Sequence, residues 1–132
     1  MTSPEDTLET ASGQSAAVFA RLVVMKTRAD FVAASKARYQ TATGLTVQMR
    51  DRGDDDPTVR VGFTCSKKVG NAVARNRAKR RLRAVADAVL AEQAQPGWDY
   101  VLVGRPGVTI DRPFDALKGD LSYALRKIHA PT

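Results

Sequence analysis

Alternation of apolar and polar residues predicts two strands in the first half of the chain. Residues 45–50 place apolar side chains at every second position, which is typical of a strand with one buried face. Residues 58–66 alternate in the same way and carry Gly62 on their polar face. That face can admit an extended polar ligand, although a plain solvent-exposed sheet face explains the alternation equally well. Between the two strands, DRGDDDP at residues 51–57 is typical of a turn.

Apolar residues at helical spacing predict three helices around these strands. The first is expected over residues 27–36, capped by the hydroxyl of its first residue. Asn71 is the expected cap of the longest helix, residues 72–93, whose buried stripe comprises Ala78, Leu82, Val85, Ala86 and Val89. A short apolar run at residues 100–103 predicts a central strand, and residues 114–128 predict the last helix. The predicted order is therefore α-β-β-α-β-α, without an internal repeat.

Length and composition favour one folded domain. The chain has 132 residues, of which 43% are hydrophobic, enough for one domain with its own core. Residues 1–17 are polar and poor in bulky apolar groups, so we expect a disordered tail there. The apolar segment at residues 18–25 then begins a single domain that extends to residue 132.

The chain has the composition of a soluble cytoplasmic protein. No run approaches the ~18 consecutive apolar residues of a membrane span, and the opening residues lack the basic region and apolar core of a signal peptide. Cys65 is the only cysteine, which excludes an intrachain disulfide and fits a reducing compartment.

Positive charge is concentrated in one segment. The chain has 21 lysines and arginines against 14 aspartates and glutamates, a formal net charge of +7. No acid occurs from residue 57 to residue 86, whereas residues 66–83, SKKVGNAVARNRAKRRLR, contain eight lysines and arginines. Like charges four residues apart on a helix cost roughly 0.2–0.5 kcal/mol per pair, and the positive end of the helix dipole adds to this repulsion. A polyanion such as nucleic acid, or an anionic membrane surface, is the expected partner, with a merely solvated basic face as the alternative.

The sequence shows no set of residues typical of a protein active site. His129 is the single histidine, Cys65 lies on the apolar side of its strand, and no carboxylate lies near the basic segment. These positions form no acid–base or metal-binding constellation. The run GFTCSKK also lacks the second glycine directly before the lysine that a phosphate-binding loop requires. We expect no catalytic residue and no metal ligand in the chain.

The run RVGFTCSKKVGNAVARNRAKRRLR, residues 60–83, resembles the protein subunit of bacterial ribonuclease P, most specifically at the arginine-asparagine-arginine of residues 75–77. Weaker similarity extends from about residue 21 to residue 129 and includes RADF and WDYVLVGR. The resemblance implies a compact α/β sandwich with a small, largely antiparallel sheet and a left-handed β-α-β crossover through the basic helix. It also implies that residues 18–132 form one RNA-binding ribonuclease P protein domain.

In this family the RNA subunit is the catalyst, which cleaves the 5′ leader from precursor transfer RNA with bound magnesium, and the protein assists. The resemblance therefore implies an accessory subunit of an endoribonuclease. Its implied partners are ribonuclease P RNA and precursor transfer RNA, with no membrane, and its self-association is left open. Magnesium is implied to be bound mainly by the RNA and by no protein side chain.

The resemblance assigns the basic helix to the catalytic RNA and a cleft between the first helix and the sheet to the single-stranded leader. Carried over, the contacts to the RNA subunit would come from Arg75, Asn76, Arg77, Lys79, Arg80 and Arg83. Candidates for the leader or adjacent RNA are Phe31, Arg60, Lys67 and Lys68. For Phe31, a place in the core and a role in stacking on a base are equally open. Ser35 stands where many members have a second aromatic residue, and Tyr39 is a candidate replacement two turns along if the helix persists.

Bulk charge alone also fits a ribosomal or other structural RNA-binding protein that takes no part in cleavage. A DNA-binding protein would carry the same charge, and only the resemblance argues against it. A salt titration does not separate these alternatives, because all of them contact phosphate, whereas binding to purified RNA classes does.

Overall fold

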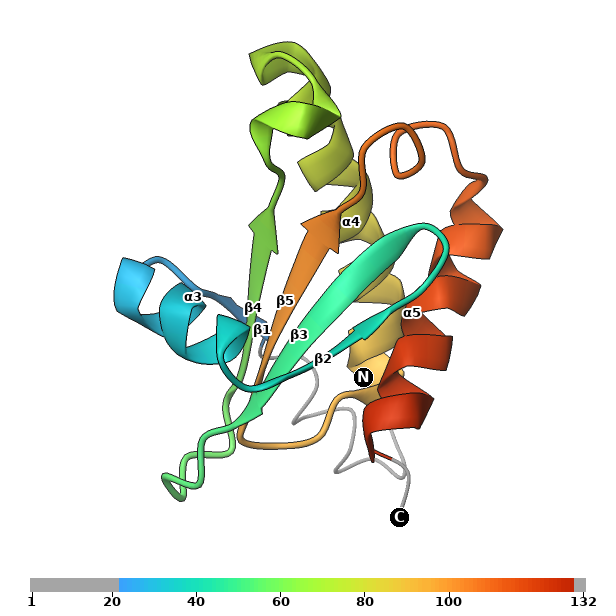
Figure 1. Cartoon of the computed structure of the whole chain (residues 1–132). Coiled ribbons are helices and arrows are strands. Elements are labelled where there is room, and N and C mark those ends of the chain that lie inside the picture. Colours follow the sequence, from blue (N-terminus) through green and yellow to red (C-terminus); the bar gives the residue numbers. More distant parts are fainter. Residues whose placement is uncertain (1–21, 130–132) are drawn as a thin grey trace, which may run out of the picture.

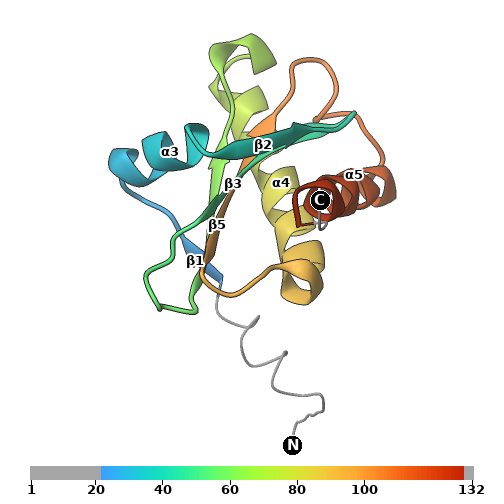
Figure 2. The same ribbon diagram turned by 60° about the horizontal axis from the view of Figure 1, so that its bottom comes forward.

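The computed structural model describes residues 22–129, in which a five-stranded sheet separates one short helix from two longer ones (Figure 1). The strands are β1 (Leu22–Val24), β2 (Arg38–Thr41), β3 (Leu45–Asp51), β4 (Val59–Thr64) and β5 (Trp98–Gly104), in the spatial order β1-β4-β5-β3-β2. The helices are α3 (Arg28–Ser35), α4 (Ala72–Gln93) and α5 (Phe114–His129), with the 3-10 turn η1 (Lys67–Val69) before α4. Figures 1 and 2 both place α3 on one face of the sheet and α4 and α5 on the other.

The elements predicted from periodicity are present, and two short strands are added to them. The expected helices at residues 27–36, 72–93 and 114–128 correspond to α3, α4 and α5. The predicted order α-β-β-α-β-α lacks β1 and β2, which have three and four residues. Such short strands carry too few positions for a period of two, and β2 is largely exposed at the edge of the sheet. The predicted disordered tail, residues 1–17, lies outside the described residues.

The sheet is mixed, so the expectation of a largely antiparallel sheet is corrected. β3 pairs antiparallel with β2 and with β5. β4 pairs parallel with β1 and with β5. The parallel pairing of β4 with β5 arises because α4 carries the chain back along the sheet, which gives the expected β-α-β crossover through the basic helix.

The main core lies between the sheet and the two long helices. Leu45, Val47 and Met49 of β3 are fully buried there, as the alternation predicts. The predicted stripe of α4 is buried against them, and α5 adds a second stripe that comprises Leu117, Leu121, Ala124, Leu125 and Ile128. None of the helices within residues 22–129 is suited to crossing a lipid bilayer.

The opposite face of the sheet has only a thin cover. A small cluster of Met25, Ala34 and Val101 holds α3 against it, with Phe31 and Val103 packed alongside. Because α3 has eight residues, it covers only part of the sheet. The fold therefore leaves a groove beside α3.

Candidate nucleic-acid interface

η1 and the first half of α4 form one cationic surface, which we call the basic ridge. It carries the eight predicted positions Lys67, Lys68, Arg75, Asn76, Arg77, Lys79, Arg80 and Arg83. Figure 1 shows the first turns of α4, in green, projecting beyond the ends of the strands. The structure thus brings Lys67 and Lys68, which were candidates for the leader, to the start of the helix expected to bind the RNA subunit.

Local sequence explains where the helix of the basic ridge begins. The side chain of Asn71 accepts a hydrogen bond from the backbone N–H of Ala74 at 2.9 Å, which confirms the predicted cap. Gly70 connects η1 to this cap with φ 148°, and a Cβ there would lie 2.7 Å from the Cβ of Ala74. Only glycine fits this turn without strain.

Six of the eight side chains of the basic ridge are exposed and available to an anion. Asn76, Arg77, Arg80 and Arg83 are exposed, and the half-buried Arg75 donates to the carbonyl of Gly70 at 2.8 Å. None of the ion pairs found within residues 22–129 involves a cation of the basic ridge. Its positive charge is therefore not neutralised within the described part of the chain.

Arg81 differs from its neighbours on α4. It is half-buried, its Nε donates to the carbonyl oxygen of Thr109 at 3.1 Å, and its Nη2 donates to the carbonyl oxygen of Arg112. Both acceptors lie in the loop between β5 and α5. Arg81 therefore fastens that loop to α4 and belongs to the fold.

A groove of about 260 Å³ lies between α3 and the sheet, where the resemblance expects one. It is lined by Arg28, Phe31, Val32 and Ser35 of α3, Gln48 of β3 and Thr64 of β4. Of these residues, the resemblance singles out only Phe31 and Ser35. Gln48 and Thr64 occupy polar positions of the two alternating strands. The alternation predicts that both side chains face away from the core, but their place in one groove follows only from the strand order, in which β3 and β4 lie on either side of β5.

Phe31 both packs on the sheet and lines the groove. A Cβ on Gly62 would lie 2.5 Å from Cε1 of Phe31, so the missing side chain of this glycine makes room for the ring. Phe31 nevertheless stays half-exposed and forms part of the groove wall. At Gly62, the polar face of β4 is thus covered by an aromatic side chain of the protein itself.

Tyr39 reaches the same face of the sheet by a route that the sequence did not predict. α3 ends at Ser35, so the helix does not persist to Tyr39 and the condition for a position two helical turns along is not met. Tyr39 lies in β2 directly opposite Gln48 of β3, and residues directly opposite in an antiparallel pair have their side chains on the same face. With 68% of its surface exposed, the ring stands on the groove side of the sheet.

Arg60, a candidate for the leader, is engaged within the protein. Its guanidinium donates to Asp99 from Nε at 2.8 Å and from Nη2 at 2.7 Å. It also donates to Asp30 of α3 from Nη1 at 3.2 Å. The structure therefore places Arg60 beside the groove as a bridge between two carboxylates.

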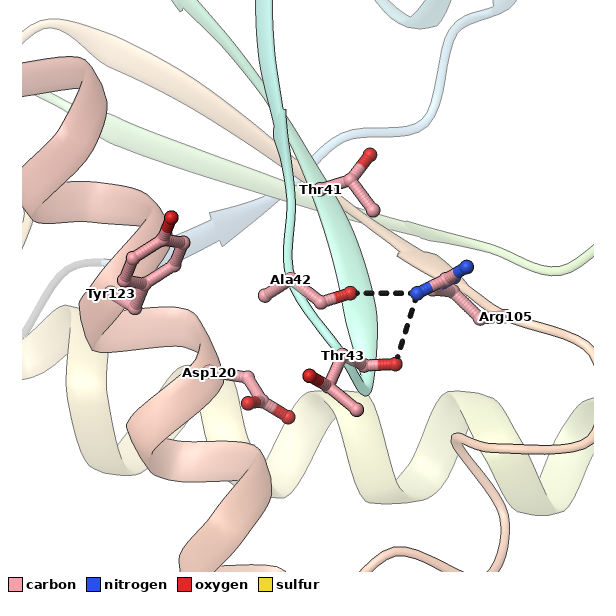
Figure 3. A pocket seen from close by; sticks show the side chains of 6 residues that line it. All are labelled: Thr41, Ala42, Thr43, Arg105, Asp120 and Tyr123. Atoms are coloured by element: carbon pink, nitrogen blue, oxygen red, sulfur yellow. Dashed lines mark hydrogen bonds between the residues drawn. The ribbon is translucent and has the colours of Figure 1, made fainter.

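A second concavity of about 520 Å³ lies between the β2–β3 turn and α5 (Figure 3). Figure 3 shows Arg105 donating to the carbonyl oxygens of Ala42 and Thr43, at 2.9 and 3.1 Å. Asp120 accepts from the backbone N–H of Gly44 at 3.0 Å and pairs with Arg112. These polar groups hold the turn against α5 and against the loop that precedes it, so the larger concavity is explained by the fold. No group of three or more potential metal-ligating residues is found within residues 22–129.

These features define a class: a small α/β domain with an arginine-rich ridge and a polar groove beside an open sheet face, suited to binding a polynucleotide. The sequence model of the Ribonuclease P family matches residues 19–129. The chain therefore belongs to the family of ribonuclease P protein components, which are subunits of an endoribonuclease ribonucleoprotein.

Individual relatives support this assignment. The chain is 60% identical over 109 residues to a ribonuclease P protein component of Ruegeria pomeroyi, covering 82% of this chain and 87% of the relative. It is 49% identical over 106 residues to the ribonuclease P protein component of Caulobacter vibrioides, and the match covers 80% of this chain and 70% of the relative.

Solved structures share the fold. The ribonuclease P protein of Staphylococcus aureus superposes with a TM-score of 0.65 at 25% identity, covering 80% of this chain and 94% of that one. The protein from Thermotoga maritima gives a TM-score of 0.66 at 23% identity, covering 80% and 97%. The α/β sandwich is therefore the fold of known ribonuclease P proteins.

Proposed function

We propose that this chain binds the RNA subunit of ribonuclease P through the basic ridge and the 5′ leader of precursor transfer RNA in the groove beside α3. In this way it assists the RNA-catalysed removal of the leader in the cytoplasm. The observation that carries the proposal is that the charge of the basic ridge has no carboxylate partner among residues 22–129.

The basic ridge suits the phosphates of a folded RNA. Arginine guanidinium groups contact phosphate through two parallel hydrogen bonds, which lysine does not make. The first backbone N–H groups of α4 add partial positive charge at the same end. The arginines that stabilise the fold, such as Arg52 and Arg81, donate hydrogen bonds to carboxylate or carbonyl oxygens within the protein. Arg77 and Arg80 are exposed instead, which supports a role in binding.

The groove suits an unpaired strand. Phe31 offers a ring on which a base can stack, worth ~1–3 kcal/mol per base. Gln48 and Thr64 offer hydrogen-bonding groups, and Arg28 offers a cation for phosphate. Tyr39 adds a second, strongly exposed ring on the same face, and we assign it the role of the aromatic residue that Ser35 lacks.

We propose that magnesium is bound mainly by the RNA and not by side chains of this chain. Mg²⁺ keeps several waters and prefers phosphate and carboxylate oxygens, and the basic ridge and the groove are lined by cationic and neutral side chains. The side chains of this chain bind and orient RNA, and the bond is broken by chemistry that the RNA supplies.

Binding to purified RNA classes tests this function. At fixed salt, we expect the chain to bind ribonuclease P RNA more tightly than a ribosomal RNA fragment of equal length. The reconstituted complex should also bind precursor transfer RNA more tightly than mature transfer RNA, because only the precursor has a leader. Equal affinity for the two large RNAs, with no gain from the leader, would instead favour a structural RNA-binding protein.

A further inference from the structure

A network of charged side chains lies on the α3 face of the sheet. At its centre Asp99 of β5 is fully buried and accepts from two arginines, Arg52 at 2.7 Å and Arg60 at 2.7 and 2.8 Å. The guanidinium of Arg60 continues outward to Asp30, at 3.2 and 3.3 Å. Arg60 thus joins a carboxylate of the sheet to a carboxylate of α3.

The two ends of this bridge differ in how firmly they are fixed. Asp99 has 0% exposure of its side chain and keeps Arg52 as a partner, so the inner pair is part of the core. The side chains of Arg60 and Asp30 are each 25% exposed, and exposed pairs are individually weak. The outer pair is therefore the part that can be broken without burying an uncompensated charge.

α3 depends on such contacts for its position. A helix of eight residues is marginal by itself. Its first turn meets β4 at two positions of one strand face, Asp30 on Arg60 and Phe31 on Gly62. Because four of the six residues that line the groove belong to α3, the placement of this helix sets the shape of the groove.

We propose that Arg60 and Asp30 form a latch that positions α3, and with it Phe31, for binding of the leader, so that Arg60 is a positioning residue and not a contact to RNA. This inference rests on the proposed binding of the leader in the groove. Arg60 would then have a different role from the contact to the leader that the resemblance implies.

The two roles for Arg60 predict opposite results for the variant Asp30→Asn. If Arg60 contacted the leader, the variant would free the guanidinium and remove a negative charge, so that the affinity for the leader would rise. If the pair is a latch, α3 loosens and that affinity falls. The start of α3 is preserved, because Thr27 Oγ1 still accepts from the backbone N–H of residue 30 and an amide oxygen still accepts from the Thr27 hydroxyl.

The readout is the affinity of the reconstituted complex for precursor transfer RNA divided by its affinity for mature transfer RNA. We expect Asp30→Asn to lower this ratio about two- to fivefold, the range of a partly exposed ion pair. Affinity for the RNA subunit should not change, which distinguishes a local effect from general unfolding. Relative to the wild type, amide hydrogen exchange in the variant should accelerate more in α3 than in α4.

Asp55→Asn is the matched control. It removes the same charge from an exposed turn, at a residue with φ 61° that asparagine tolerates, and we expect the ratio to equal that of the wild type. An unchanged or raised ratio in Asp30→Asn would overturn the latch while leaving the leader function intact. A wild-type ratio near one would overturn the leader function itself, and the latch with it.

Discussion

Arg80 and Arg81 are adjacent in α4 and have the same charge, yet replacing each with alanine should affect different properties. Arg80 is exposed, whereas Arg81 is half-buried and donates to the carbonyl oxygens of Thr109 and Arg112. We expect Arg80→Ala to weaken RNA binding and Arg81→Ala to weaken folding. The pair compares two substitutions of equal chemistry one position apart.

The magnitudes follow from what each side chain loses. Loss of one phosphate contact should lower the slope of log affinity against log salt by about 0.7–0.9. The free energy of unfolding of Arg80→Ala should stay within about 0.5 kcal/mol of the wild type, as for other surface substitutions. Arg81→Ala removes a charged donor from two carbonyl groups, which should lower the free energy of unfolding by about 1.5–3 kcal/mol.

Two measurements check this prediction. Urea unfolding gives the stability of each variant, and binding to ribonuclease P RNA at several salt concentrations gives the slope. Arg77→Ala, another exposed position of the basic ridge, should behave like Arg80→Ala. If Arg81→Ala lowered the slope as much as Arg80→Ala while keeping wild-type stability, the division between structural and RNA-binding arginines would be refuted.

Three further predictions concern the core, the groove and pH. Leu82→Ala should lower the free energy of unfolding by ~2–5 kcal/mol, because the side chain is fully buried; a thermal melt like that of the wild type would contradict the placement of α4. Gly62→Ala should displace Phe31 and lower the free energy of unfolding by about 1–3 kcal/mol. It should also reduce the gain in affinity that the leader gives to precursor transfer RNA over mature transfer RNA. An unchanged gain would show that leader binding does not need the ring of Phe31 over Gly62. Burial lowers the pKa of His129 below its ordinary value of 6.5, so the unfolded state binds more protons and stability should fall as pH decreases from 6.5 towards the folded pKa. In urea titrations across this window, His129→Gln should show a smaller fall than the wild type, and identical curves would argue against this contribution.

The parts of the fold with long periodic patterns could be predicted from the sequence. α4 has 22 residues and a continuous buried stripe, and its cap at Asn71 is a local feature. β3 alternates over residues 45–50, with Val47 and Met49 buried as expected, and only its last residue, Asp51, departs from the pattern. In these elements the pattern itself records which side faces the core.

The pairing of strands and of charges could not be predicted, because it depends on residues far apart in the chain. The partners of Arg60 are 30 and 39 positions away, so the sequence shows its charge but not its engagement. The short edge strand β2, which carries Tyr39, has polar residues on both faces and no detectable period. The sequence alone does not distinguish Arg81 from Arg80, because the two carbonyl groups that bind Arg81 come from the distant β5–α5 loop.

Reconstituted cleavage of precursor transfer RNA at low magnesium tests the central claim most directly. Ribonuclease P RNA should cleave slowly alone under this condition, and addition of the chain should restore removal of the leader. The chain freed of all RNA should leave the substrate intact. A complex that forms but cleaves no faster than the RNA alone, or cleavage by the RNA-free chain, would contradict the account.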